Sequence, residues 1–103
     1  MLRIGKDHEG GEVEVGVGEP FEIEFHEHPT TGYRWHLQPL EPGITVESDD
    51  HRAGEAQPGA PSLRRWQFRA SKAGTFALEL QARRSWEKRP AQTFKVMIRV
   101  KPT

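Results

Sequence analysis

Three side chains in the first third of the chain have the types and spacing of a metal site. Glu24, His26 and His28 stand at alternate positions, so in a strand they would share one face. His36 could approach from the next strand, and carboxylate and imidazole groups are typical ligands of a divalent metal. The same spacing also describes the polar face of a half-buried strand. We favour this second interpretation and predict no metal and no other cofactor.

Covalent catalysis has little support in the sequence. The chain contains no cysteine, which removes thiolate nucleophiles, thiolate metal sites and disulfides together. No serine lies in a nucleophile-elbow sequence, and the chain has no glycine-rich phosphate-binding loop. We therefore predict that the protein is not an enzyme, and that packing and strand pairing alone hold the fold.

Two other features suit binding better than catalysis. The segment 28–33 (HPTTGY) predicts a stiff turn, because proline fixes φ near about −65° and glycine can take positive φ. Trp86 lies in a charged stretch between Arg84 and Glu87, beyond the last alternating apolar position. It is either a lid over the end of the fold or an exposed anchor for a partner, and tryptophan and arginine are both enriched at binding hot spots.

Alternation of apolar and polar residues with a period of two dominates the chain. It predicts seven strands, with a possible eighth at the edge around Leu2 and Ile4, and no segment predicts a helix. We therefore predict an all-β, immunoglobulin-like antiparallel β-sandwich of seven or eight strands. Residues 1–103 are enough for a single domain. The inward positions are Val13, Val15, Val17, Phe21, Ile23, Phe25, Tyr33, Trp35, Leu37, Ile44, Val46, Trp66, Phe68, Ala70, Phe76, Leu78, Leu80, Ala82, Phe94, Val96, Ile98 and Val100.

Three connections between these strands stand out in composition: residues 28–33, 56–63 and 84–91. The longest unpatterned stretch, 48–63, is rich in glycine, alanine and proline and predicts a mobile loop. The loops of a sandwich gather at its two ends. Three of them at one end would form a composite binding edge.

The charge of the chain is divided between its halves, although the net charge is zero. Residues 1–50 contain 12 acidic and 3 basic side chains, whereas residues 51–103 contain 3 acidic and 12 basic ones. The simpler interpretation is that acidic early strands pair with basic late strands. The other is a surface with one positive end that meets an acidic partner. The basic residues are too scattered to predict nucleic-acid binding.

The sequence is compatible with more than one cellular compartment. No apolar run approaches the roughly 18 residues of a membrane span, and the first residues contain no signal-peptide core. A cytoplasmic protein fits these facts, and so does a periplasmic or secreted protein that has lost its signal peptide. We expect a monomer that binds neither nucleic acid nor membrane.

Three segments, taken in order, resemble the chagasin family of cysteine-peptidase inhibitors. HPTTGYRW (28–35) is similar to the family's NPTTG(Y/F)-x-W signature. GAPSLRRWQF (59–68) occupies the place of its GxGG loop, and ARRSWE (82–87) the place of its RPW loop. SKAGTFALEL and TFKVMIRV are similar to its later strands. The resemblance covers nearly the whole chain, from about Gly10 to Lys101.

The resemblance implies a reversible inhibitor of papain-like cysteine peptidases, whose three loops fill the active-site cleft as a wedge. Thr30, Thr31 and Gly32 would lie over the catalytic cysteine–histidine pair. The loop at 59–63 would follow the non-primed side of the cleft, and the loop at 84–91 the primed side. The residues assigned to peptidase binding are His28, Pro29, Thr30, Thr31, Gly32, Tyr33, Gly59, Ala60, Pro61, Ser62, Arg84, Ser85 and Trp86.

The three loops depart from the family pattern at named positions. His28 replaces an asparagine, Pro61 and Ser62 replace a glycine pair, and Ser85 replaces the proline of RPW. Pro61 removes an N–H that could pair with the peptidase, and Ser85 loosens the third loop. These changes favour an alternative: a non-inhibitory immunoglobulin-like module for protein binding or adhesion.

Overall fold

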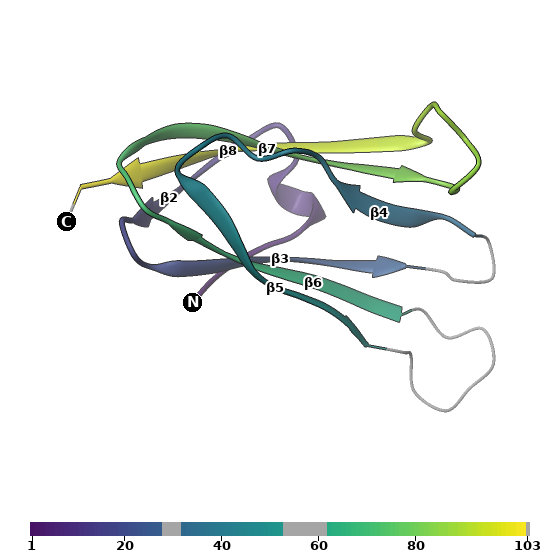
Figure 1. Ribbon diagram of the computed structural model, residues 1–103, viewed down its shortest axis with the longest axis horizontal. Coiled ribbons are helices and arrows are strands. Elements are labelled where there is room, and N and C mark those ends of the chain that lie inside the picture. Colours follow the sequence, from purple (N-terminus) through teal and green to yellow (C-terminus); the bar gives the residue numbers. More distant parts are fainter. Residues whose placement is uncertain (28–31, 53–61, 103) are drawn as a thin grey trace.

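The computed structural model describes residues 1–27, 32–52 and 62–102, which form two four-stranded sheets packed face to face (Figure 1). One sheet has the strand order β1-β3-β6-β5 and the other β2-β8-β7-β4. This confirms the predicted sandwich, including the edge strand near the N-terminus. The elements are β1 (Leu2–Ile4), the short 3₁₀ helix η1 (Lys6–His8), β2 (Glu12–Gly16), β3 (Pro20–Glu27), β4 (Arg34–Leu37), β5 (Ile44–Arg52), β6 (Ser62–Ala70), β7 (Gly74–Arg83) and β8 (Gln92–Lys101).

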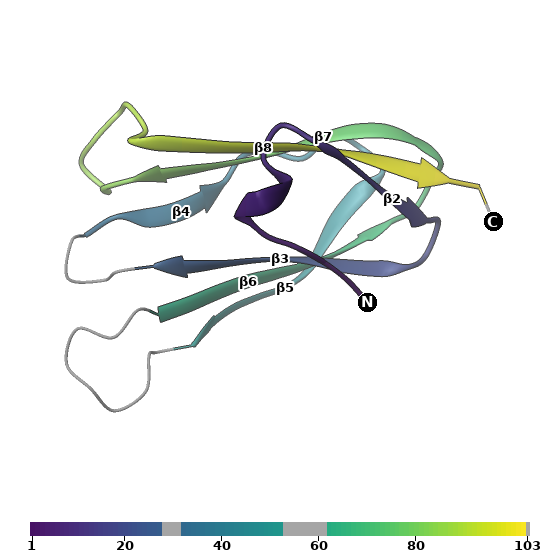
Figure 2. The same cartoon turned by 180° about the vertical axis from the view of Figure 1, so that it is seen from behind.

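Two edge strands pair in a direction that the sequence did not indicate. Among the described residues, β1 pairs with β3 and β2 pairs with β8 in parallel, whereas the other four pairings are antiparallel. The chain crosses from the first sheet to the second through η1 and then returns from β2 to β3, as Figure 2 shows from behind. Alternation indicates which face a residue occupies but not the direction of its neighbour, so a purely antiparallel sandwich was the wrong expectation for these two pairs.

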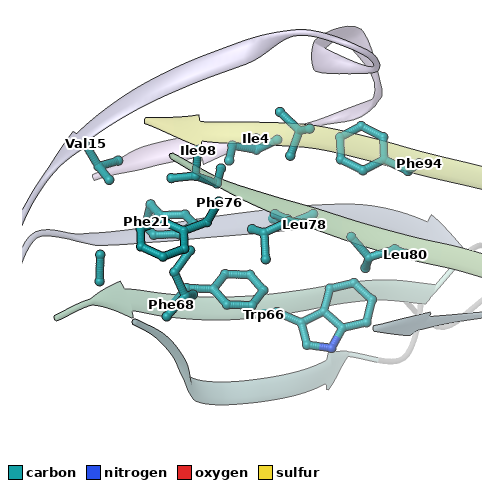
Figure 3. Close-up of a cluster of buried hydrophobic side chains, with 14 of the residues drawn as sticks. Ile4, Val15, Phe21, Trp66, Phe68, Phe76, Leu78, Leu80, Phe94 and Ile98 are labelled. Carbon is teal, nitrogen blue, oxygen red and sulfur yellow. The ribbon is translucent and has the colours of Figure 1, made fainter. Parts of the chain in front are cut away.

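The core consists of the inward side chains of both sheets (Figure 3). Phe21 and Phe68 stack from paired strands with ring centroids 5.3 Å apart, and Trp66 beside them is only 1% exposed. Toward the end where β3 stops, Phe25 stacks on Trp35 at 4.6 Å. The prediction that Trp35 and Trp66 are core residues is therefore confirmed.

The loop predicted over 48–63 is shorter than expected. β5 continues to Arg52 and β6 begins at Ser62, so both ends of the predicted loop are strand. The reason is an irregularity between Val46 and Ser48, where the register with β6 shifts. Such a bulge interrupts the alternation, and the following polar residues pair with β6 without any apolar pattern to reveal them.

The divided charge of the chain is explained by strand pairing. Glu22 of β3 lies 3.9 Å from Arg65 of β6, Glu47 of β5 lies 2.8 Å from Arg69 of β6, and Glu14 of β2 lies 2.9 Å from Lys101 of β8. In each pair an acidic residue from the first half of the chain meets a basic residue from the second. This confirms the simpler interpretation of the charge pattern.

Candidate binding edge

Six strand ends lie at one end of the sandwich (Figure 1). The ends of β3 and β5 are level with the start of β6, because Glu27 pairs with Ser62 and Arg52 with Leu63. In the other sheet, Arg34 pairs with Arg83, and Ala82 with Gln92. The three connections chosen from the sequence are therefore rooted at the same end.

The predicted binding residues divide into two sets. Gly32, Tyr33, Ser62, Arg84, Ser85 and Trp86 belong to the described part of the chain. The prediction for the others falls outside the described residues; these are His28, Pro29, Thr30, Thr31, Gly59, Ala60 and Pro61.

Arg84 joins the first connection to the third. Its guanidinium carbon lies 4.4 Å from the centre of the Tyr33 ring and 5.9 Å from the centre of the Trp86 ring, distances at which a cation is attracted to an aromatic face. Gly32 has φ +80°, and a Cβ built on it would lie 3.5 Å from the tip of the Trp86 ring. Two of the three predicted loops are therefore in contact.

Trp86 is an exposed residue and not a lid. It is 73% exposed, more than any other large hydrophobic side chain of the described residues. Its main chain is held in a turn, because Glu87 N–H donates to Arg84 O at 3.0 Å, and the base of the loop is closed where Ala91 N–H donates to Ala82 O at 2.8 Å. A large aromatic ring on a braced turn is well suited to act as a binding anchor.

Tyr33 and Ser62 differ from what the sequence suggested. β4 begins only at Arg34, and Tyr33 is half-buried, with its ring against Arg84 and not deep in the core. Ser62 is 3% exposed and lies directly opposite Glu27. Its side chain faces the interior of the sandwich at the root of the second loop.

Glu27 is a buried acidic residue beneath the binding edge that the sequence reasoning missed. Its side chain is 1% exposed. Its Oε2 accepts a hydrogen bond from Trp35 N–H at 2.7 Å, and its Oε1 lies 3.4 Å from His51 Nε2 and 3.9 Å from Arg34 Nη1. The hydrogen bond joins the residue before the first loop to β4, so it brackets residues 28–33. The contact with His51 reaches the root of the second loop.

A second charged pair joins β5 to β6 toward this end of the sandwich. Arg64 is paired opposite Phe25 in β6 and donates to both carboxylate oxygens of Asp49, each at 2.9 Å. Its guanidinium also lies 4.7 Å from the centre of the Trp66 ring. Two-pronged arginine–carboxylate pairs fix geometry as well as charge, so this pair holds the Arg64 guanidinium over the Trp66 ring.

His36 on β4 is a partly buried histidine close to the positive charge of Arg83. Burial lowers its pKa below the ordinary value of 6.5, and the nearby positive charge of Arg83 acts in the same direction. Its Nε2 is buried and has no hydrogen-bond partner in the described part of the chain. The folded protein therefore favours neutral His36.

This preference predicts a pH dependence of stability. Because the unfolded chain binds the His36 proton more readily than the folded one, the free energy of unfolding should fall as pH drops from about 7.5 to about 5.5. His36→Gln should reduce that slope. Urea unfolding at several pH values measures it, and His26→Gln, on the exposed face of β3, is the matched control. An unchanged slope in His36→Gln would contradict the assignment.

The residues considered for a metal site have other surroundings. Glu24 Oε2 lies 4.0 Å from Arg3, His26 is exposed, and His28 lies outside the described residues. Across residues 1–27, 32–52 and 62–102, no group of three or more potential ligands is placed to hold a metal ion. No helix in the same residues has the length and apolar character needed to span a membrane.

Together, the sandwich and its loop end define a β-sandwich protein with a candidate binding edge at one end. Residues 14–98 match the model of the family described as "Chagasin family peptidase inhibitor I42", and the chain belongs to that family. It is 31% identical to chagasin of Trypanosoma cruzi over 90 residues, and this match covers 82% of each of the two chains. This confirms the resemblance inferred from the three loop segments, and the protein is a peptidase inhibitor by family and not an enzyme.

Solved structures support the same fold. The crystal structure of the cysteine protease inhibitor EhICP2 from Entamoeba histolytica superposes with a TM-score of 0.86 at 21% identity, over 97% of this chain and 95% of that one. The structure of PbICP-C in complex with falcipain-2 gives a TM-score of 0.72 at 16% identity, over all of both chains. At these identities, the likeness bears on the fold alone.

Proposed function

We propose that the protein reversibly inhibits papain-like cysteine peptidases by placing the loops 28–33, 56–63 and 84–91 in the active-site cleft. The observation that carries the proposal is the exposed Trp86, held against Gly32 at the end where all three loops are rooted. The family supports the activity, since the matching model describes peptidase inhibitors. Two proteins of the same fold are a cysteine protease inhibitor, EhICP2, and a protein solved in complex with falcipain-2, PbICP-C.

The first loop would occupy the centre of the cleft. An inhibitor avoids cleavage when it fills the cleft without presenting a carbonyl in attack geometry. The hydroxyls of Thr30 and Thr31 would meet the catalytic pair, since a hydroxyl can hydrogen-bond without being an electrophile. The Trp35–Glu27 hydrogen bond ties together the two strands on either side of the first loop, and such a link would reduce the conformational entropy lost on binding.

The other two loops would extend the contact on either side. Residues 59–61 would follow the non-primed side as an extended segment, with Pro61 contributing shape and no N–H. On the primed side, Trp86 and Arg84 would pack on the enzyme. Ser85 need not weaken this loop, because its turn is closed by main-chain hydrogen bonds of Glu87 and Ala91.

The test is a titration of papain and a cathepsin-L-like enzyme with the purified protein at about pH 5.5 to 7. We expect competitive, reversible inhibition with a 1:1 end point, and intact inhibitor recovered from the complex. Trypsin, a serine peptidase with a different cleft, is the control and should be unaffected. A peptidase whose cleft is already filled by a covalent peptide inhibitor should no longer bind. Absence of inhibition at micromolar concentration would favour the non-inhibitory binding module.

A further inference from the structure

The basic side chains of the protein differ in whether an acidic side chain lies near them. Most of those on the sheets have a carboxylate within 4.0 Å; these are Arg3, Arg34, Arg64, Arg65, Arg69, Arg99 and Lys101. At the loop end, Arg52, Lys88 and Arg89 are exposed, and among the described residues none of them has such a partner. Lys6, Lys72 and Lys95 are also exposed without such a partner among the described residues, but they lie apart from one another on η1, in the turn before β7 and on β8. Lys88 and Arg89 differ from them because they are adjacent and belong to the loop that presents Trp86.

The three loops at this end contain few acidic residues. The segment 28–33 contains no Asp, Glu, Lys or Arg, and the single residue of these types in 53–61 is Glu55. In the third loop, the one acidic residue is Glu87, which is half-buried with a buried Oε1. Lys88 and Arg89 directly follow it, and the guanidinium of Arg84 lies on the other side, between Tyr33 and Trp86. The surroundings of the exposed tryptophan are thus positively charged.

We infer that the peptidase partner of this protein has an acidic rim on the primed side of its cleft, where the loop 84–91 would dock. This inference rests on the proposed function and adds a selectivity to it. Exposed, unpaired charges contribute little to the stability of a fold, but they accelerate association with a surface of opposite charge and suppress association with one of like charge. Trp86 would bury a similar contact area against many peptidases. Lys88 and Arg89 would favour those peptidases that carry negative charge beside the cleft.

The position of the charges favours a protein cleft over a polyanion such as nucleic acid. The basic residues do not form a stripe along a strand or helix, as an electrostatic footprint on nucleic acid would require. They flank one exposed aromatic ring on a braced turn. That combination of a central aromatic anchor with a charged rim is typical of a protein–protein interface.

The test compares association rates for two charge-reversal variants. Lys88→Glu/Arg89→Glu reverses charge at the edge. Lys72→Glu/Lys95→Glu makes the same change in net charge at two exposed positions, in the turn before β7 and on β8. Both are measured by stopped flow against two papain-like enzymes, one with an acidic and one with a neutral primed-side rim, at low salt and at about 0.5 M salt.

We expect the edge variant to associate at least about tenfold more slowly with the acidic-rimmed enzyme at low salt, and high salt to remove most of the difference. The Lys72/Lys95 variant should keep the wild-type rate, and the neutral-rimmed enzyme should not distinguish the variants. Lys88→Gln/Arg89→Gln, which only removes charge, should give an intermediate rate and controls for any effect of the new carboxylates on folding.

The outcomes separate the two proposals. Inhibition of both enzymes with equal association rates for the edge and control variants would overturn the acidic-rim inference and leave the proposed function standing. Absence of inhibition of either enzyme would overturn both. Binding of the protein to anionic vesicles or to an oligonucleotide at physiological salt, without any rate difference between the peptidases, would assign the basic edge to a polyanion and contradict the inference.

Discussion

Trp86→Ala is expected to weaken inhibition of a papain-like peptidase by about 30-fold or more, which is roughly 2 kcal/mol of binding free energy. The ring is 73% exposed in the free protein, so its truncation removes little native packing. In the complex the same ring would be buried, and a tryptophan supplies a large contact area for few rotatable bonds. The melting temperature should therefore stay close to that of the wild type while the inhibition constant rises.

Progress-curve kinetics will show which rate changes. Loss of an anchor in an existing interface acts mainly on dissociation, so we expect the complex of Trp86→Ala to dissociate faster. Trp86→Phe should recover part of the affinity, because it keeps an aromatic face for Arg84. Val46→Ala is the matched control. Val46, which the alternation wrongly predicted to face inward, is also an exposed hydrophobic residue but lies near the opposite end of β5. Equal affinity of wild type and Trp86→Ala would remove Trp86 from the interface.

The sequence was sufficient for the layers of the fold because alternation reports burial directly. Successive side chains of a strand point to opposite faces, so the apolar residues Phe21, Ile23 and Phe25, at alternate positions, all face the core. The direction of β1 and β2 could not be predicted, because parallel and antiparallel neighbours bury the same residues. The length of β5 could not be predicted either, because the register shift after Val46 interrupts the alternation of apolar and polar residues that indicates a strand.

The binding edge was predictable only in part. Trp86 stood out because a large aromatic residue in a charged loop lies beyond the inward positions that build the core. The contacts of Arg84 with the rings of Tyr33 and Trp86 depend on how two separate loops pack together, and a local sequence pattern does not predict such packing. Glu27 carried one usable signal: it has the same phase as Phe25 at the end of an alternating run. A charged residue at an inward position next to a turn marks a place where the fold needs a buried acceptor.

Glu27→Ala is expected to lower the free energy of unfolding by about 2 to 3 kcal/mol, because it leaves the buried Trp35 N–H without its acceptor and takes the carboxylate away from His51. It should also weaken inhibition under conditions where the variant is fully folded, since the lost hydrogen bond brackets residues 28–33. Glu27→Gln keeps an oxygen that can accept from Trp35 N–H, and should recover most of the inhibition but less of the stability.

Urea unfolding and inhibition constants for the same three proteins separate a structural role from a positioning role. If Glu27 only stabilises the fold, the inhibition constant of folded Glu27→Ala will equal that of the wild type. If it positions the first loop, that constant will rise and Glu27→Gln will restore it. Glu24→Ala is the control, because Glu24 is on the same strand but its carboxylate faces Arg3 on the outer face, and it should change neither quantity by more than about 0.5 kcal/mol. A rise in the inhibition constant for Glu24→Ala as large as for Glu27→Ala would show that the strand as a whole, and not the buried acceptor, determines the position of the loop.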